Sequence, residues 1–380
     1  DRVRCAVDPD TEVRRLSNSD KQMVEIAKAL GRDARVLVMD EPTAVLTNAE
    51  ASVLFEQVRQ LRDAGTAILF TSHKLDEVAA IADQVTVMRD GAVVRSCPAS
   101  EIDEDEMATA MVGRDVSELY PARTAGAPGA TALSVRGLDV PGHAADVGFD
   151  LHWGEILGVA GLIGSGRTEA MEGLCGLRPA RCASLEIDGA RVAIRSPADA
   201  LKYRLCYLTE DRKLRGLLLE KGMRENLTLQ ALDRFSGLLI DRRAEERALD
   251  SAIRDFDIRA GRRDIAVGNL SGGNQQKLLL AKVMQSEPRI LIADEPTRGI
   301  DIGTKQQIYA FLRRLAGEGH AIVMISSEMQ EVIGMADRVM VMRLGRVAGT
   351  LAAAHATEDA IVRLAMGVGA RALVADGEVA

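Results

Sequence analysis

An internal repeat at a constant spacing is the feature that most constrains the fold of this chain. Residues 16–22 correspond to 270–276, and the tetrapeptide Asp-Glu-Pro-Thr occurs at 40–43 and again at 294–297. Residues 72–73 and 88–91 correspond in the same way to 326–327 and 342–345, always 254 positions apart. A constant offset over about 75 residues without a gap indicates two copies of one folding unit.

Each copy alternates short apolar runs with helical patterns. The apolar runs are residues 35–39 and 66–71 in the first copy, and 289–293 and 320–326 in the second. Apolar residues at helical spacing cover 50–64 and 304–317. This alternation predicts an α/β fold, with a mostly parallel sheet and flanking helices. Ligands bind such sheets at the carboxyl ends of the strands, where four acids are expected: Asp40, Glu41, Asp294 and Glu295.

A stretch rich in Pro, Gly and small residues at 121–131 predicts a flexible linker between the copies. Residues 1–120 would then be the C-terminal part of the first module, and 132–375 a complete second module. Only 15 residues precede the segment 16–22, whereas about 130 precede its counterpart in the second module. We therefore expect an N-terminal truncation of the first module, or further chain upstream of residue 1.

Composition narrows the possible partners. The net charge of −8 argues against nucleic acid, because binding a phosphate backbone favours a basic surface. No apolar run approaches the roughly 18 residues that a membrane crossing needs, and no secretory signal is recognisable. The five cysteines are scattered without a CxxC pair, which disfavours a cysteine metal site.

A glycine-rich segment at 161–168, Gly-Leu-Ile-Gly-Ser-Gly-Arg-Thr, follows the apolar strand 155–160 and precedes an apolar helix. This context is typical of a phosphate-binding loop, and the alternative is a tight strand-to-helix turn without a ligand. The predicted nucleotide-binding residues are Gly161, Gly164, Ser165, Gly166, Arg167 and Thr168. Thr168 would also place its hydroxyl on Mg²⁺. Arg167 replaces the usual lysine, so we expect nucleotide binding to survive more readily than fast turnover.

The acid pairs at the strand ends are the predicted catalytic groups. Asp294 and Asp40 would hold Mg²⁺, while Glu295 and Glu41 would polarise the attacking water. Two acids that merely cap a strand are the alternative, which the recurrence of the same tetrapeptide makes the weaker one.

The segment 270–276, Leu-Ser-Gly-Gly-Asn-Gln-Gln, opens a predicted helix over 275–284. Its first residues can present N–H groups and a hydroxyl to the γ-phosphate of ATP. We predict nucleotide contacts from Ser271, Gly272, Gly273 and Gln275. The alternative is a serine–glycine helix cap without a function.

These motifs together resemble the ATPase subunits of ABC transporters. Within them, the segments LSGGNQQ, ADEPTRGID, GSGRTE and TEDR are most similar to the tandem sugar-import ATPases of the ribose, galactose and xylose type. Residues 16–30, 40–47 and 111–121 resemble the first half of those proteins, so the resemblance spans almost the whole chain. It implies a P-loop NTPase fold of ABC type, with a helical signature subdomain, an antiparallel β part, and one partial and one complete module.

In that family two modules enclose two nucleotides, each between the glycine loop of one module and the signature of the other. The resemblance therefore implies one site that combines the acids of the first module and His73 with the signature of the second. His73 would contact the γ-phosphate, and its counterpart is Ser327. The other site would combine the loop 161–168 and the second acid pair with the degraded signature 17–20. Glu210 occupies the position of a usual glutamine and is implied as a metal sensor.

The resemblance implies an ATP- and Mg²⁺-dependent subunit at the cytoplasmic face of the cell membrane. Its partners would be membrane permease subunits and, within the same system, a sugar-binding protein. Two alternatives remain: a degenerate nucleotide-binding or regulatory module without turnover, and a soluble tandem protein acting on ribosomes or DNA. The degraded signature at 17–20 counts against the last. We expect weak ATP binding through 161–168 and little turnover.

Overall fold

The computed structural model describes residues 7–31, 34–43, 46, 48–72, 74–89, 91–112, 120–123, 129–237 and 239–368. Internal contacts divide the chain into two compact units. The first unit is Asp1–Leu119 with Asp301–Gly303, and the second is Tyr120–Ile300 with Thr304–Ala380. Among the described residues, no helix combines the length and the apolar character that a membrane crossing needs.

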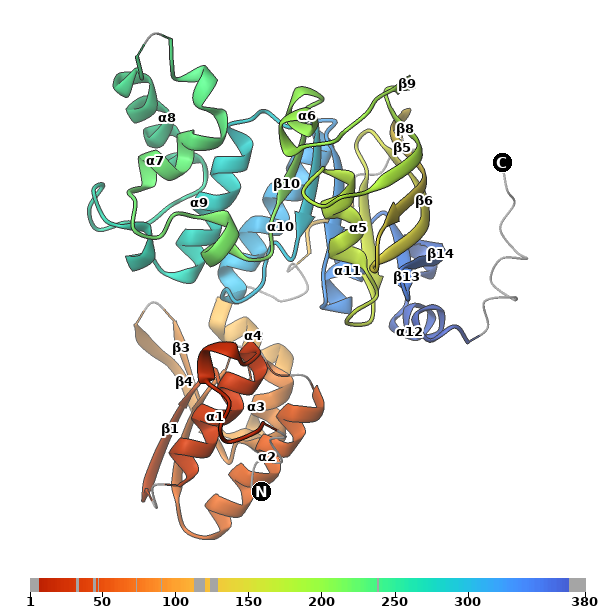
Figure 1. The fold of residues 1–380 in the computed structure, drawn as a ribbon. Coiled ribbons are helices and arrows are strands. Elements are labelled where there is room, and N and C mark those ends of the chain that lie inside the picture. The colour runs from red at the N-terminus through yellow and green to blue at the C-terminus, as the bar shows by residue number, and fades with distance from the viewer. Residues whose placement is uncertain are drawn as a thin grey trace. The chain divides into compact units, whose positions relative to one another are not determined.

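A six-stranded sheet forms the centre of the second unit (Figure 1). Its strands, in spatial order, are β10 (Leu205–Leu208), β11 (Ile290–Asp294), β12 (Ala321–Ile325), β7 (Ile156–Gly161), β13 (Arg338–Arg343) and β14 (Arg346–Ala352). All neighbouring pairs are parallel except β13 and β14. The carboxyl ends of β7, β11 and β12 therefore lie at one edge, where ligands bind sheets of this kind.

The two faces of this sheet have different covers. A second, antiparallel sheet contains β5 (Thr131–Val140), β6 (Ala144–His152), β8 (Arg181–Ile187) and β9 (Ala190–Arg191). Together with α5 (Arg167–Leu174) it shares a buried apolar core with one face, including Leu157, Ile292 and Val323. The other face packs Val339 and Val341 against α11 (Met329–Met335) and α12 (Glu358–Met366).

A helical part of the second unit lies beside β10, where Figure 1 shows α7, α8 and α9 grouped together. These helices are α7 (Met223–Thr228), α8 (Arg242–Asp255) and α9 (Gly272–Met284), with α6 (Pro197–Lys202) and the short η5 (Leu229–Arg234) and η6 (Val267–Asn269). The π-helical turn η4 (Arg212–Gly216) follows β10. Between β11 and β12 the chain forms α10 (Ile302–Gly317), and η7 (Ala353–His355) precedes α12.

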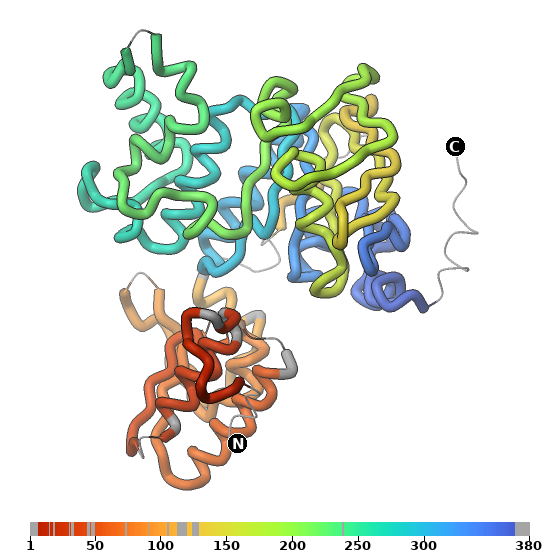
Figure 2. The backbone as a smooth tube through the Cα atoms, viewed as in Figure 1, coloured from red at the N-terminus to blue at the C-terminus, as the bar shows by residue number. Residues whose placement is uncertain are grey.

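The first unit, red to orange in Figure 2, repeats the elements of the second unit from η6 to α12, each 254 residues earlier. They are η1 (Val13–Arg15), α1 (Asn18–Leu30), β1 (Val36–Asp40), α2 (Asn48–Asp63), β2 (Ala67–Thr71), α3 (Leu75–Ile81), β3 (Gln84–Arg89), β4 (Ala92–Pro98), η2 (Ala99–Glu101) and α4 (Glu104–Val112). The parallel pair β1–β2 and the antiparallel pair β3–β4 keep the register of their counterparts, including the irregularity after Val87 and Val341.

The predicted α/β fold with a mostly parallel sheet is confirmed, and it includes the helical and antiparallel parts. The strands expected at 35–39, 66–71, 289–293 and 320–326 are β1, β2, β11 and β12, each within a residue of its expected limits. The signature helix starts three residues before the expected 275, because Ser271 caps it. Of the predicted linker 121–131, residues 124–128 lie outside the described part, and β5 starts at Thr131.

Candidate functional site

The glycine loop 161–166 connects β7 to α5 with a backbone that only glycine adopts easily. Gly161, Gly164 and Gly166 all have positive φ, at 154°, 77° and 87°. A Cβ on Gly166 would come within 2.5 Å of the His143 carbonyl oxygen. The loop therefore requires glycine both for its conformation and for the close approach of a neighbouring chain segment.

The same loop has features of an anion site. It precedes the first turn of α5, where backbone N–H groups lack partners within the helix. The Ser165 hydroxyl is buried and makes no hydrogen bond among the described residues. An uncommitted hydroxyl beside N–H groups that lack partners within the helix fits phosphate oxygens, which accept several hydrogen bonds at once.

Asp294 ends β11 with its side chain fully buried. Burial raises the pKa of Asp294 to about 6, against the opposing effect of the Tyr207 and Thr168 hydroxyls, which favour the carboxylate. Tyr207 donates to Asp294 Oδ2 at 2.5 Å, whereas the buried Oδ1 makes no hydrogen bond to any residue that the structure describes. An uncommitted carboxylate oxygen near a threonine hydroxyl fits Mg²⁺, which binds to one or two carboxylates and otherwise to substrate phosphates and water.

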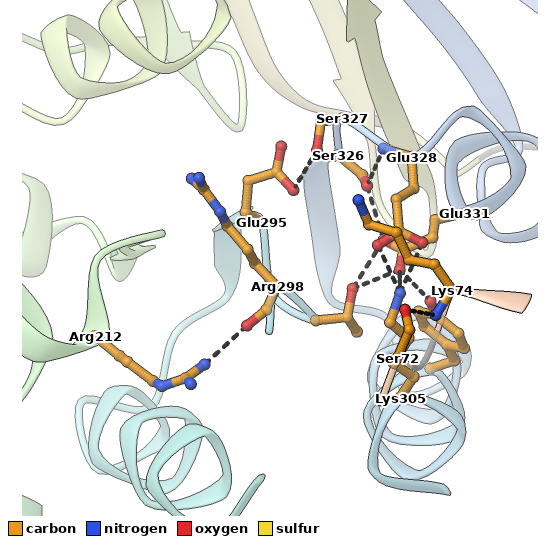
Figure 3. A network of polar contacts seen from close by, with 12 residues as sticks. Ser72, Lys74, Arg212, Glu295, Arg298, Lys305, Ser326, Ser327, Glu328 and Glu331 are labelled. Carbon is orange, nitrogen blue, oxygen red and sulfur yellow. Dashed lines mark hydrogen bonds and ion pairs between the residues drawn. The ribbon is translucent and has the colours of Figure 1, made fainter. Parts of the chain in front are cut away.

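Glu295 has a strained backbone, with φ at 47°, and its N–H donates to the Ile325 carbonyl at 2.9 Å. Ser327 donates to Glu295 Oε2 at 3.2 Å, as Figure 3 shows. Burial raises the pKa of Glu295 to about 7, and Arg167 opposes this shift. A left-handed non-glycine residue at a strand end is a strained arrangement of the kind that recurs at functional sites.

Arg167 links the glycine loop to the acids. From the start of α5 it donates to the Ser326 carbonyl at the end of β12, at 2.8 Å. Burial lowers the pKa of Arg167, but Glu295 and Asp294 favour its charged form. Three strand ends, of β7, β11 and β12, thus meet around one partly buried cation and two buried acids.

Glu210 lies close enough for its charge to act on Asp294 and Arg167. Its carboxylate is bound to Arg298, with 2.9 Å between Oε2 and Nη1. No group of three or more potential metal-binding side chains occurs in the described part of the chain. A metal here would therefore depend on few protein ligands, as Mg²⁺ does when it binds together with nucleotide phosphates.

Ser271 caps α9 and accepts a hydrogen bond from the Asn274 N–H, and Gly272 and Gly273 form the first turn. The Gln275 amide is buried and donates to the carbonyls of Val267 and Leu270, at 3.2 and 3.1 Å. The predicted contact of Gln275 with nucleotide stays a prediction, because only its amide N–H is engaged and its buried Oε1 makes no hydrogen bond among the described residues. Its side chain also braces the turn that precedes the signature.

Comparisons with known proteins bear on this arrangement. A model of the ABC transporter family matches residues 144–298. "Ribose import ATP-binding protein RbsA 2" of Streptomyces avermitilis is 45% identical over 96% of this chain and 72% of its own length. This chain belongs to the ABC transporter family. A "putative ribose/galactose/methyl galactoside import ATP-binding protein" of Ralstonia nicotianae is 44% identical, covering 96% of this chain and 70% of that protein.

Solved structures agree on the fold of the ABC module. The ADP conformation of MJ1267, an ATP-binding cassette of an ABC transporter, matches with a TM-score of 0.52 and 18% identity over 62% of this chain and 99% of that one. A nucleotide-free ATP-binding cassette from an ABC transporter has the same TM-score, with 17% identity over 65% and 100% of the two chains. The P-loop NTPase fold of ABC type expected for the second unit is therefore confirmed.

The first unit repeats part of this ABC site. Glu41 has the same left-handed backbone as Glu295, with φ at 44°, and Thr71 donates to Asp40 at 2.5 Å. Ser17 caps α1 and accepts from the Asp20 N–H. His73 lies outside the described residues, so its predicted contact with a γ-phosphate stays a prediction.

Two groups of contacts at the ABC site were not foreseen from the sequence. Tyr207 holds Asp294, and Arg212 donates to two carbonyls that follow Glu295. A buried network around Glu331 also binds Thr297, two residues after Glu295, and Ser326, next to Ser327 (Figure 3). The repeat carried a signal for this network, because Thr43, Ser72 and Glu77 stand at the matching positions.

Proposed function

We propose that this chain is the ATP-binding and hydrolysing subunit of an ABC importer for monosaccharides, which drives solute uptake through a membrane permease. The carrying observation is the meeting of the glycine loop and the acid pair at one sheet edge, joined by the Arg167 hydrogen bond to Ser326. The relatives at 44–45% identity are named as ribose or ribose/galactose/methyl galactoside import proteins.

Each group at this site has a proposed role. The loop N–H groups and Arg167 bind the phosphates of ATP, and Asp294 and Thr168 provide oxygens for Mg²⁺. Glu295 orients the attacking water, because burial raises its pKa to about 7, near the pH at which a general base works best. The signature residues Ser271, Gly272 and Gly273 and the first-unit residues Asp40, Glu41 and His73 keep the roles that the family resemblance implies.

The proposed permease partner would bind a surface whose residues contact this site. A hollow of about 760 Å³ adjoins it on the second unit. Tyr207, which binds Asp294, and Thr209, next to Glu210, line the hollow together with Arg178, Arg215 and Leu201. A permease segment seated there would contact the residues that hold the metal ligands. We place the subunit at the cytoplasmic face of the membrane, in a system that includes a sugar-binding protein.

A second candidate function is nucleotide binding without turnover. Ser327 occupies the place of the histidine expected from the resemblance, and it donates to Glu295, the proposed water-orienting acid. Arg167 replaces lysine and is not a conservative substitute for it. Both substitutions affect hydrolysis more directly than binding.

The test compares two glycine substitutions in the full chain. G166A places a Cβ 2.5 Å from the His143 carbonyl, whereas G189A meets nothing within 4 Å at a similar positive φ. Affinity for a fluorescent ATP analogue should fall at least about tenfold in G166A, equivalent to ~1.4 kcal/mol, and stay unchanged in G189A. Phosphate release from ATP then separates the two candidates: turnover supports the importer ATPase, and binding without turnover supports the second candidate. Absence of binding in the wild type would contradict both.

A further inference from the structure

The turn that follows Glu295 is held from three sides within the second unit. Arg298 N–H donates to the Glu295 carbonyl at 3.2 Å, which closes the turn. Gln276 of α9 donates to the Pro296 carbonyl at 2.7 Å, and Thr297 donates to the buried Glu331. These contacts place the Arg298 side chain at a defined position next to the acid pair.

Arg212 provides the third contact. Its guanidinium donates to the carbonyls of Arg298 and Gly299 at 2.8 and 3.1 Å, and Figure 3 shows it reaching Arg298. Asp211 caps the π-helical turn that carries Arg212, by accepting from the N–H groups of Lys213 and Leu214. A planar guanidinium can satisfy two carbonyls at once, which an ammonium group does less well.

Arg212 also explains a glycine of the signature. A Cβ on Gly272 would lie 2.9 Å from Arg212 Nη2 and 3.2 Å from the Gly299 carbonyl. The start of α9, the turn after Glu295 and the segment after β10 therefore meet at the Arg212 guanidinium. Any displacement of Arg212 would act on all three.

Glu210, two residues before Arg212, completes this arrangement. The Glu210 carboxylate binds the Arg298 guanidinium at 2.9 Å. The turn after Glu295 is therefore held by Arg212 through its backbone carbonyls, and it binds Glu210 through the Arg298 side chain. Glu210 still acts electrostatically on Asp294, the proposed metal ligand. A carboxylate that is bound to an arginine is a weaker metal ligand than a free one, because the cation competes for the same oxygens.

We propose that Arg212 and Arg298 are positioning residues for Glu210: Arg212 fixes the turn, and Arg298 holds the Glu210 carboxylate until a Mg²⁺–nucleotide complex competes for it. This inference rests on the proposed nucleotide site, and adds a control on how strongly Mg²⁺ favours binding there. Opening the Glu210–Arg298 pair is then a cost that Mg²⁺–ATP bears and metal-free ATP does not.

The experiment measures the affinity of the full chain for a fluorescent ATP analogue with Mg²⁺ and with EDTA. R298A should increase the ratio of the two affinities by up to about fivefold, equivalent to ~1 kcal/mol for a half-exposed ion pair. R212A should act in the same direction, whereas R298K should retain the wild-type ratio. The matched control is R363A, which removes an exposed pair with Asp359 at 2.8 Å on α12 and should leave the ratio unchanged.

The E210Q background decides whether the effect passes through Glu210. R298A should have no effect on the ratio there, so an equal increase in both backgrounds would overturn the proposal, as would an R298A ratio equal to that of the wild type. If the wild type binds no nucleotide at all, the proposed function fails separately. The Glu210–Arg298 ion pair is then tested by thermal unfolding of R298A, E210Q and the double mutant. An interaction free energy of zero between the two substitutions contradicts the proposal. R212K replaces R212A if the latter does not fold.

Discussion

The first unit repeats the helices and strands of the second unit from η6 to α12, but among the described residues only the second unit joins its strands into one continuous sheet. In the second unit β12 and β13 both pair with β7, which lies between them. Their counterparts β2 and β3 belong to separate two-stranded sheets among the described residues. The strand that carries the glycine loop is therefore also the strand that joins the two halves of the sheet.

Matching positions on the strands differ in burial between the two units. Ile292 is fully buried under α5 and the antiparallel sheet, whereas Val38, its counterpart, is 63% exposed. Val36, Leu69 and Met88 are exposed as well, although Ile290, Val323 and Met342 are buried. Local sequence is sufficient for each helix and strand, but the apolar face needs distant segments to cover it.

A buried glutamate is retained in both units with a different cation. Glu331 binds Lys305 at 2.9 Å and the Tyr309 hydroxyl at 2.5 Å. In the first unit Ala51 and Phe55 replace that lysine and tyrosine. Lys74, which stands where the second unit has Glu328, pairs with Glu77 at 3.1 Å instead. Each unit thus balances its buried carboxylate with one lysine, but from a different position.

The largest difference is expected when these lysines are removed. K305A leaves the buried Glu331 without its cation and should lower the free energy of unfolding of the second unit by ~3–5 kcal/mol. Lys74 is 37% exposed, so K74A should cost the first unit only ~1 kcal/mol. Hydrogen exchange of amides in β12 and β2 reports the two losses separately. Equal losses of unfolding free energy in K305A and K74A would show that the two lysines are equally desolvated, and would contradict this difference between the units.

Sequence reasoning predicted the elements well because the repeat constrained each of them twice. The Asp-Glu-Pro-Thr segments placed two strand ends, and the glycine loop placed a third. The contacts of Arg212 and Tyr207 could not be predicted in this way, because their partners are 86 to 87 residues distant and depend on how the strands are ordered. The replacement of Lys305 by Lys74 could not be predicted either. The residues differ between the units at three matching positions, although the pairing of the buried glutamate with a lysine is kept.

Substituting the aspartates Asp294 and Asp40 is expected to change the stability of the two units with a different dependence on pH. Folding raises the pKa of Asp294 from 3.8 to about 6, so the folded state binds this proton more tightly than the unfolded state. The destabilisation is absent below pH 3.8, grows as the pH rises, and is complete above about 6. D294N should therefore stabilise the second unit by ~3 kcal/mol at pH 7.5 and by almost nothing at pH 4, measured by urea unfolding.

The counterpart substitution is the control for this prediction. Asp40 is exposed, and D40N should change the stability of the first unit by less than ~0.5 kcal/mol at either pH. A D294N gain that does not depend on pH would refute burial of the charge as its cause.

Gly91 and Gly345 lie at matching positions of the hairpins β3–β4 and β13–β14. They test whether a chain segment packs against the hairpin of the first unit as one does in the second. Gly91 and Gly345 have nearly the same φ, at 79° and 76°, so alanine carries a similar backbone strain of ~1 kcal/mol at both. A Cβ on Gly345 would also come within 2.5 Å of the His143 carbonyl, whereas a Cβ on Gly91 meets nothing within 4 Å. G345A should thus cost ~1–3 kcal/mol more than G91A, read from hydrogen exchange in β13 and β3. Similar costs would mean that a segment also packs against Gly91 in solution.

The smallest expected effect decides whether the apolar face of the first unit is open in solution. Val38 lies at the centre of β1 with its side chain exposed, so V38T removes no buried contact. Its stability change should stay within ~0.5 kcal/mol, while binding of a hydrophobic dye to the chain decreases. The same type of change at Ile292, I292T, should cost at least ~2 kcal/mol, because it buries a hydroxyl in a closed core. If V38T instead costs as much as I292T, a polypeptide segment covers β1 in solution, and the two units are more alike than their exposed surfaces indicate.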